Sequence, residues 1–195
     1  MPNPSTRRVL TSDIAATPWK NGGGVTRELA TGGGSGSDWG WRVSLAEVAQ
    51  DGPFSAFPGV DRVIAVIEGA GMDLVRPDGS TISLEPFRPV RFAGEEPLSG
   101  RLRAGPVRDL NVMVRRGVFG AAMEFLRGPC RVERTIGDGD ALLLLGLAGR
   151  PSVGVNAAPP LELATGEMLL YDAQGRFEFQ LVDGSRIALI RIEAR

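Results

Sequence analysis

The stretch PWKNGGGVTRELA, residues 18–30, gathers an aromatic ring, an amide and cationic side chains around three glycines. Lys20 is the sole lysine of the chain and precedes Gly22–Gly24, whereas a phosphate-binding loop places its lysine after the glycines and opens a helix. A strand-like run follows instead, which also excludes the dinucleotide-binding fingerprint. The glycines therefore predict a sharp backbone bend, with Trp19 and Lys20 as candidate binding residues beside it.

Histidine is absent from the sequence, which removes the usual general base and the commonest transition-metal ligand. Serine–histidine and cysteine–histidine catalytic pairs are excluded for the same reason. Cys130 is the sole cysteine, so neither an intramolecular disulfide nor a cysteine-rich metal site can form. We therefore expect no metal and no cofactor, and the lone cysteine fits a reducing compartment such as the cytoplasm.

Charge and hydropathy exclude two classes of partner. The chain has 22 basic and 23 acidic residues, a net charge of -1 and a pI near 5.6, so it lacks the electropositive field that binds nucleic acids and anionic membranes. Its longest apolar run, residues 141–148, is far shorter than the roughly 20 residues that cross a bilayer. We expect a cytoplasmic protein that binds neither nucleic acid nor membrane.

The pattern of apolar residues predicts an all-β fold. The 27 glycines and 14 prolines separate short, often alternating apolar runs. The expected elements are strands over 25–30 and 39–48, a mobile Gly/Ser loop over 31–38, a single helical turn over 52–59, and a meander of three strands over 60–86. The Asp78–Gly79 dipeptide predicts a hairpin turn within this meander.

A weak internal repeat links the two halves of the chain. The run IAVIEGAG resembles LLLLGLAG, with Gly71 lying 78 positions before Gly149. Further along, Phe92 lies 79 positions before Tyr171. Similar runs at a nearly constant offset predict a duplicated β-barrel or sandwich unit.

Three long motifs resemble one protein family. The stretches TPWKNGGGVTRELA, WRVSLAEVAQDGPFSAFPGVDRVIAVIEGAGMDL and DLNVMVRRG are similar to the HutD/Ves family of small bicupin proteins. The resemblance implies two cupin-type β-barrels of the jelly-roll kind, over residues 1–117 and 118–195, packed closely together. It also implies a bacterial cytoplasmic protein that forms homodimers. The HutD branch implies a small-molecule-binding modulator of histidine utilisation, with urocanate or formylglutamate as ligand, and the Ves branch a role in the stress response.

The same resemblance suggests an anion site. The cupin signature G-x5-H-x-H-x3,4-E-x6-G holds a metal ion with histidine and glutamate side chains. With Gly69 as the closing glycine, Arg62 occupies the glutamate position, and Ser55 and Phe57 occupy the histidine positions. A permanently protonated arginine cannot bind a cation, so the preference changes from metal to anion. A guanidinium near Phe54 and Phe57 suits a carboxylate on a flat or short apolar body.

The predicted ligand-binding set is Trp19, Lys20, Asn21, Arg27, Ser44, Phe54, Phe57, Asp61, Arg62 and Asn111. No residue is predicted to be catalytic or to bind a metal. A structural alternative remains open for Arg62, as an ion pair with Asp61 or Glu47, and for the phenylalanines, as ordinary core residues. Arg27 and Glu28 point to opposite faces of a regular strand, so only one of them faces the interior.

Three functions are compatible with the sequence. The first is a metal-free, non-catalytic bicupin that binds a small carboxylate and modulates histidine utilisation. The second is a metal-independent isomerase, epimerase or lyase, in which Lys20 with Glu28 or Asp61 supplies acid and base. The third is an interaction module of the Ves type, with an exposed sheet that binds a protein partner. The lack of histidine weakens the enzyme hypothesis without excluding it.

Overall fold

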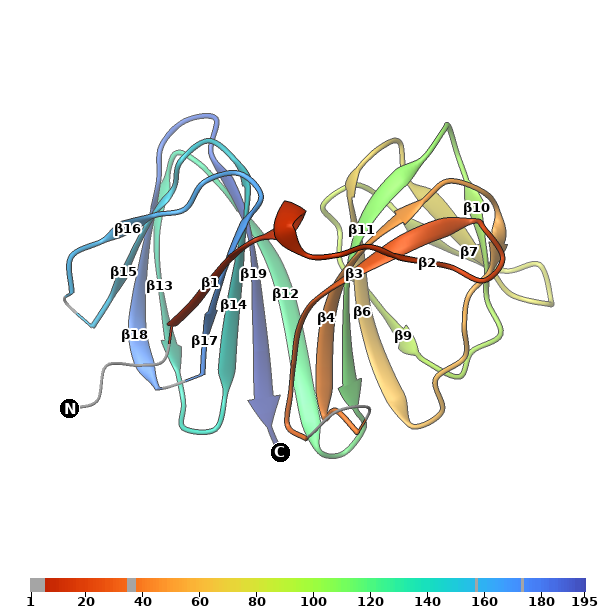
Figure 1. The fold of residues 1–195 in the computed structure, drawn as a ribbon, viewed down its shortest axis with the longest axis horizontal. Helices are drawn as coiled ribbons and strands as arrows, with labels where there is room; N and C mark the ends of the chain where they lie inside the picture. Colours follow the sequence, from red (N-terminus) through yellow and green to blue (C-terminus); the bar gives the residue numbers. More distant parts are fainter. Residues whose placement is uncertain (1–5, 35–37, 157, 173) are drawn as a thin grey trace. The chain divides into compact units, whose positions relative to one another are not determined.

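The computed structural model describes residues 6–34, 38–156, 158–172 and 174–195 (Figure 1). Within these ranges the regular structure consists of strands, apart from the 3-10 turn η1 (Thr11–Asp13). The fold is therefore all-β, as the sequence predicts. The expected loop over 31–38 falls partly on residues 35–37, which lie outside the described residues. No helix in the described ranges is long and apolar enough to cross a membrane.

The chain forms two compact units. The unit that we call the central unit runs from Ile14 to Gly120. The other, which we call the terminal unit, combines the chain up to Asp13 with Ala121–Arg195.

The N-terminal segment is placed differently from the sequence-based domains, which assign residues 1–117 to one domain and 118–195 to the other. Strand β1 (Thr6–Leu10) pairs with β17 (Glu167–Tyr171), so the segment up to Asp13 belongs to the terminal unit. The sequence-based boundary differs because β1 forms its backbone hydrogen bonds with a strand that is far away in the sequence. Local sequence patterns do not reveal such a pairing.

The central unit consists of two sheets. Its strands are β2 (Thr17–Pro18), β3 (Gly24–Gly32), β4 (Trp41–Val48), β5 (Gly52–Pro53), β6 (Val60–Glu68), β7 (Met72–Val75), β8 (Thr81–Leu84), β9 (Val90–Ala93), β10 (Ser99–Leu102) and β11 (Val107–Arg115). The order is β2-β3-β4-β11-β6-β9 in the six-stranded sheet and β5-β10-β7-β8 in the four-stranded sheet. The three predicted strands are present as β6, β7 and β8, but the prediction that they form a meander is wrong, because β6 belongs to the six-stranded sheet and β7 and β8 to the four-stranded one. The Asp78–Gly79 turn joins β7 to β8 as a hairpin.

The terminal unit also consists of two sheets. Its remaining strands are β12 (Phe119–Arg127), β13 (Cys130–Ile136), β14 (Ala141–Ala148), β15 (Ser152–Val155), β16 (Leu161–Glu162), β18 (Gly175–Leu181) and β19 (Arg186–Ala194). The order is β1-β17-β14-β19-β12 in one sheet and β13-β18-β15-β16 in the other.

The two units share one strand order. The orders β4-β11-β6-β9 and β5-β10-β7-β8 of the central unit recur as β12-β19-β14-β17 and β13-β18-β15-β16 of the terminal unit. Each unit thus contains eight strands that are arranged in the same order in two four-stranded sets. The pairing of strands also corresponds between the two units. Phe92 lies opposite Arg62 in the central unit, and Tyr171, its counterpart in the predicted repeat, lies opposite Leu142 in the terminal unit. The internal repeat in the sequence is therefore a repeat in topology.

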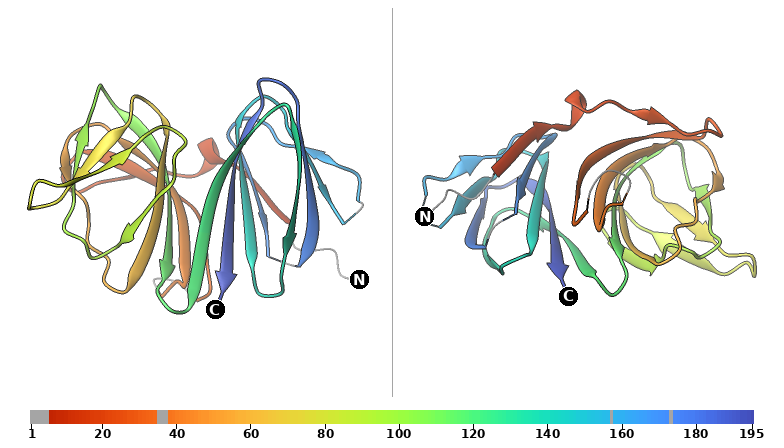
Figure 2. Two further views of the ribbon diagram at one scale, coloured as in Figure 1. Left: turned by 180° about the vertical axis from the view of Figure 1, so that it is seen from behind. Right: turned by 60° about the horizontal axis from the view of Figure 1, so that its bottom comes forward.

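Each unit has its own apolar core, to which both of its sheets contribute. Figure 2 shows the strands of these sheets from two further directions. In the central unit, Ile64 and Val66 of β6 pack with Met72 and Leu74 of β7. In the terminal unit, Tyr171 contacts Phe177 edge to face, with ring centroids 5.0 Å apart. Burial of these large side chains is the main stabilising contribution to each unit.

The prediction of a helical turn over 52–59 is wrong. After β5 this segment is an irregular loop. The amides of Phe54 and Phe57 donate to the carbonyl oxygens of Leu98 and Gly94, each at 2.8 Å. The loop therefore satisfies these backbone groups on a neighbouring segment instead of within a helical turn.

The bend predicted at Gly22–Gly24 is confirmed, and its glycines act in different ways. Gly22 has a φ of 71°, in the left-handed region, and its amide donates to the carbonyl oxygen of Trp19 at 3.0 Å. At Gly24 the constraint is space, because a Cβ there would collide with the carbonyl oxygen of Glu47 and lie 3.2 Å from ring carbons of Trp19. Gly24 thus allows β3 to begin close to β4.

We expect the substitution Gly24→Ala to destabilise the protein by about 1–3 kcal/mol, because the added methyl group meets a backbone atom that cannot move aside. Urea unfolding followed by circular dichroism measures this change. The control is Gly23→Ala, whose Cβ would meet Asn21 at an ordinary 3.4 Å. Equal stability of the two variants would contradict the close-approach explanation.

Candidate functional site

The candidate site begins at Arg62, in the six-stranded sheet of the central unit. Arg62 lies directly opposite Met113 of β11 and Phe92 of β9, and Met113 in turn lies opposite Arg42 of β4. Directly opposed residues share a face of a sheet, so these four side chains form one row. Ile64, two residues after Arg62, belongs to the core. The row therefore faces the interior of the unit.

Three phenylalanine rings surround the guanidinium of Arg62, which is only 5% exposed. Its Cζ lies 5.3 Å from the ring centroid of Phe54, 5.8 Å from that of Phe57 and 5.0 Å from that of Phe92. Gly100 leaves room for Phe54, because a Cβ there would lie 2.9 Å from the ring. These cation–π contacts hold the charged group in place without neutralising it.

Arg62 has few hydrogen-bond partners. Its Nε donates to Asn111 Oδ1 at 3.4 Å, a long contact, and no other hydrogen bond or ion pair of Arg62 occurs among the described residues. Burial lowers the pKa of Arg62 to about 10, an effect that Asp109 opposes and Arg42 reinforces. The guanidinium is therefore charged at neutral pH, and most of its five donors remain available.

The structure excludes the ion-pair alternative for Arg62. Asp61 instead accepts from Arg116 at 2.6 Å, and Glu47 pairs with Arg27. Both acids lie on the face of the sheet opposite to Arg62, because β6 and β4 alternate regularly. Arg62 is thus a buried cation without a carboxylate in contact, which is costly unless something else binds to it.

Asp109 is a second buried charge, which the sequence-based site omits. It lies two residues before Asn111 on the same face of β11 and is 2% exposed. No hydrogen bond or ion pair of its carboxyl group occurs within the described part of the chain. Burial raises the pKa of Asp109 to about 7, and the nearby charge of Arg62 limits the rise. The i, i+2 spacing of Asp109 and Asn111 within the DLN motif was the signal that could have found it.

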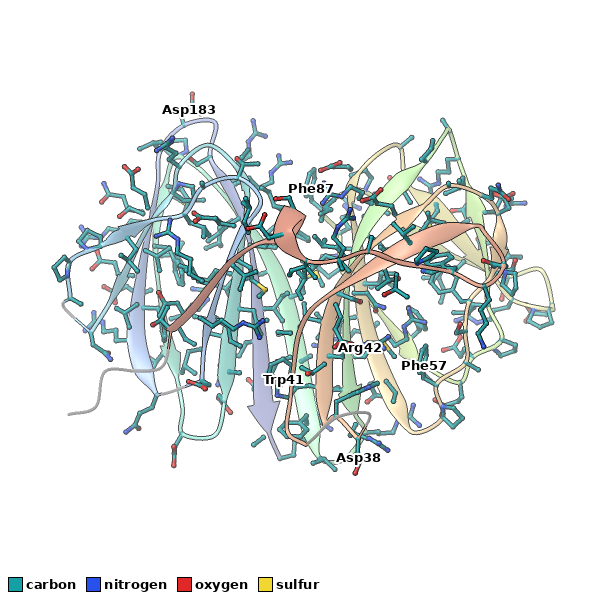
Figure 3. The ribbon with its side chains drawn as sticks, in the orientation of Figure 1. Asp38, Trp41, Arg42, Phe57, Phe87 and Asp183 are labelled. Atoms are coloured by element: carbon teal, nitrogen blue, oxygen red, sulfur yellow. The ribbon has the colours of Figure 1, made fainter. Side chains whose placement is uncertain are left out.

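Arg42 is the other omitted residue. It is half-buried on β4, with its Cζ 5.3 Å from the ring of Trp39 and 5.5 Å from that of Phe57. Arg42 and Phe57 are both labelled in Figure 3. Its Nη2 donates to Met113 Sδ at 3.1 Å. Burial lowers the pKa of Arg42, and the charge of Glu28 opposes this decrease. Arg42 therefore adds a second, half-buried cation on the same face of the sheet as Arg62.

Half of the predicted ligand-binding residues come together in the structure. Ser44 is buried directly opposite Asn111, and the loop before β6 brings Phe54 and Phe57 over Arg62. We define the Arg62 cluster by its members, which are Arg42, Ser44, Phe54, Phe57, Arg62, Phe92, Asp109 and Asn111.

The other predicted residues lie elsewhere. Trp19 packs against the central core, and its Nε1 donates to Thr26 Oγ1 at 2.8 Å, which is a structural role. Lys20 and Asn21 are exposed in the turn before Gly22–Gly24. Arg27 and Asp61 hold ion pairs on the opposite face of the sheet. The glycine-rich stretch thus shapes the sheet edge and supplies no contact to Arg62.

Comparison with known proteins identifies the family. The sequence profile of HutD matches residues 11–189. The chain belongs to the HutD family. A Pseudomonas putida relative, an uncharacterised 21.2 kDa protein from the region 3' of hutC, is 33% identical over 172 residues, which cover 85% of this chain and 90% of that protein.

Solved structures agree with this assignment. HutD from Pseudomonas fluorescens SBW25, determined in a formate condition, is 30% identical with a TM-score of 0.81, over 98% of this chain and 100% of that one. A cupin 2 conserved barrel domain protein from Leptotrichia buccalis is 11% identical with a TM-score of 0.58, over 97% of this chain and 96% of that one. The second comparison shows that this HutD chain shares the fold of a cupin protein.

Arg62, Asp109 and Asn111 have no charged or polar counterparts among the described residues of the terminal unit of this HutD chain. Both units carry a β-bulge at equivalent places, which aligns Asp109 with Ile187. Counting from this bulge, Asn111 corresponds to Leu189 and Arg62 to Leu142. Each counterpart is an apolar residue of the terminal core. The interior of the terminal unit therefore contains apolar side chains at the positions where the interior of the central unit contains charged and polar ones.

Two concavities of the terminal unit are less suited to a charged ligand. One, of about 340 Å³, contains Glu133 and Arg176, and the other, of about 160 Å³, contains Glu124 and Arg134. In both the charges already pair, Arg176 with Glu133 at 2.5 Å and Arg134 with Glu124 at 2.7 Å. We place the candidate site at the Arg62 cluster because its charges are buried without such partners.

The raised pKa of Asp109 predicts a pH-dependent stability. The folded state keeps this proton up to about pH 7, whereas an aspartate in the unfolded chain releases it near pH 3.8. The contribution of Asp109 to stability is therefore fully present below pH 3.8 and is lost as the pH rises through about 7. Relative to Asp109→Asn, the wild type should lose up to about 4 kcal/mol of unfolding free energy between pH 4 and 8. Urea unfolding across this range tests the expectation.

The control for this measurement is Asp61→Asn, which alters an acid on the opposite face of the same sheet. Its stability difference from the wild type should not follow the pH course of Asp109→Asn. A pH-independent difference between the wild type and Asp109→Asn would show that Asp109 titrates as an ordinary exposed carboxyl group.

Proposed function

We propose that this HutD-family chain is a bicupin that binds a small carboxylate metabolite and thereby modulates histidine utilisation. The observation that carries the proposal is Arg62, a charged guanidinium that is 5% exposed and makes one long hydrogen bond among the described residues. A buried, unpaired cation with free donors is the feature that an anionic ligand would complete.

The surroundings of Arg62 indicate the size and character of the ligand. The planar fork of an arginine suits a carboxylate, which can accept two parallel hydrogen bonds. The rings of Phe54, Phe57 and Phe92 favour a flat or short apolar body next to that carboxylate. The half-buried side of the cluster, where Arg42 lies near Phe57, is the side from which such a ligand would enter. Urocanate and formylglutamate are the ligands that we propose first.

The link to histidine utilisation comes from the family. The Pseudomonas putida relative is described by its position next to hutC, and the Pseudomonas fluorescens relative is named HutD. Both support a role in the same pathway for this chain. The duplicated strand order supports the two-barrel, jelly-roll organisation. A cytoplasmic homodimer completes the proposal, and light scattering of the purified protein tests the dimer.

Asp109 favours a second candidate function, metal-independent acid–base catalysis. A carboxyl group whose pKa is raised to about 7 can both give and take a proton near neutral pH. Lys20 and Asp61 do not support this function, since neither belongs to the Arg62 cluster. Solvent deuterium incorporation into a bound carboxylate, lost in Asp109→Asn, would support catalysis over simple binding.

Ligand binding is tested first by thermal shift. At about 100 times its Kd, urocanate or formylglutamate should stabilise the folded protein by roughly 2.7 kcal/mol, which corresponds to about 5–10 °C in Tm. The variant Arg62→Gln should lose this shift, because it removes the charge that attracts the carboxylate.

The control for Arg62→Gln is Arg101→Gln, which removes a cation that is 60% exposed and lies 3.8 Å from Asp73. It should keep the full ligand-induced shift. A shift that persists in Arg62→Gln would remove Arg62 from the binding site, and the lack of any shift with small carboxylates would overturn the proposed function.

The difference between the two units predicts one ligand per chain. Because Leu142, Ile187 and Leu189 fill the equivalent positions of the terminal unit, we expect isothermal titration calorimetry to give a stoichiometry near one. Two equivalent sites per chain would contradict the assignment of binding to the central unit alone.

A further inference from the structure

Arg62 and Asp109 are opposite charges that face the same interior without forming an ion pair. Both lie on one face of the six-stranded sheet, and each influences the charge state of the other. Neither group forms an ion pair among the described residues, so their nitrogen and oxygen atoms lie more than 4.0 Å apart. The two charged groups are thus not in direct contact, although such contact would be the simplest way to compensate both.

The neighbours of Asp109 do not take the place of that contact. The directly opposed residues, Val66 on β6 and Ala46 on β4, are apolar. Asn111, the next residue on the same face of β11, uses its Oδ1 to accept from Arg62. No donor within the described residues reaches the carboxyl oxygens of Asp109. An unpartnered carboxyl group that is 2% exposed is as costly as an unpartnered guanidinium.

We propose that Asp109 is a specificity-determining residue, which selects ligands that carry an N–H or O–H donor close to their carboxylate. The proposal rests on the proposed function, in which Arg62 binds the carboxylate. One molecule with both groups satisfies both buried charges at once, whereas a simple carboxylate satisfies Arg62 and leaves Asp109 without a partner. The predicted ligand class is therefore acylamino acids, hydroxy acids and related carboxylates with a nearby donor.

The sheet sets the distance between the two groups of the ligand. Residues two apart on one face of a strand are separated by roughly 7 Å. The side chain of Arg62 already reaches Asn111, which lies one such step from Asp109. The donor should accordingly lie within a few bonds of the carboxylate, as it does in an N-acyl α-amino acid.

The test compares two probes that differ in one group. N-acetylglycine has an N–H where levulinate has a CH2, and the two otherwise share the same carboxylate, carbonyl and length. Affinities are measured by isothermal titration calorimetry at pH 8.5, where Asp109 is ionised and accepts hydrogen bonds. We expect the wild type to bind N-acetylglycine at least tenfold more tightly than levulinate.

Three variants identify the source of this preference. Asp109→Asn replaces a charged acceptor with a weaker neutral one, so the preference should fall to threefold or less. Asp109→Leu removes the acceptor altogether, should abolish the preference, and provides a second reading if Asp109→Asn does not fold. Asp61→Asn, on the opposite face of the sheet, should keep the wild-type preference.

The outcomes separate this inference from the proposed function. If both probes bind equally to the wild type and neither binds to Arg62→Gln, the carboxylate site stands and the role of Asp109 is overturned. A preference for N-acetylglycine that survives in both Asp109 variants also overturns it. If neither probe nor any simple carboxylate binds to the wild type, the proposed function fails together with the inference.

Discussion

The guanidinium of Arg62 lies among three phenylalanine rings, with a single long hydrogen bond to Asn111 in the described structure. The surrounding loop and aromatic rings of the central unit stabilise this charge inside an apolar interior. The loop after β5 is anchored to the carbonyl oxygens of Gly94 and Leu98, which fixes two of the rings. Aromatic rings stabilise a cation while leaving its N–H donors free. The arrangement keeps the charge buried and still available.

Because the terminal unit has the same topology as the central unit, equivalent positions of the two units can be compared directly. The terminal unit repeats the strand order and the β-bulge of the central unit, yet it carries leucine and isoleucine where the central unit carries Arg62, Asn111 and Asp109. The fold therefore does not require charges at these positions, and an apolar interior satisfies it. Buried polar groups that a fold does not need for its stability are most simply explained by binding.

The sequence allowed the all-β fold and the repeat to be predicted, because alternation and glycine turns are local signals, and motif spacing singled out Arg62 as a candidate binding residue. Asp109 and Arg42 were missed because their position beside Arg62 depends on the register between β4, β11 and β6, which local patterns do not contain. Lys20 was included for its rarity and its neighbours in the sequence. The structure leaves Lys20 exposed, in the turn that is closed by the hydrogen bond from the Gly22 amide to the carbonyl oxygen of Trp19.

The pairing of β1 with β17 has a consequence for synthesis on the ribosome. β1 is translated before the central unit, but its partner strand Glu167–Tyr171 is translated after it. The central unit, in contrast, is one continuous segment from Ile14 to Gly120. Domains generally fold as units in the order of their synthesis. The unit that carries the Arg62 cluster can thus fold before β17, the strand that pairs with β1, has been synthesised.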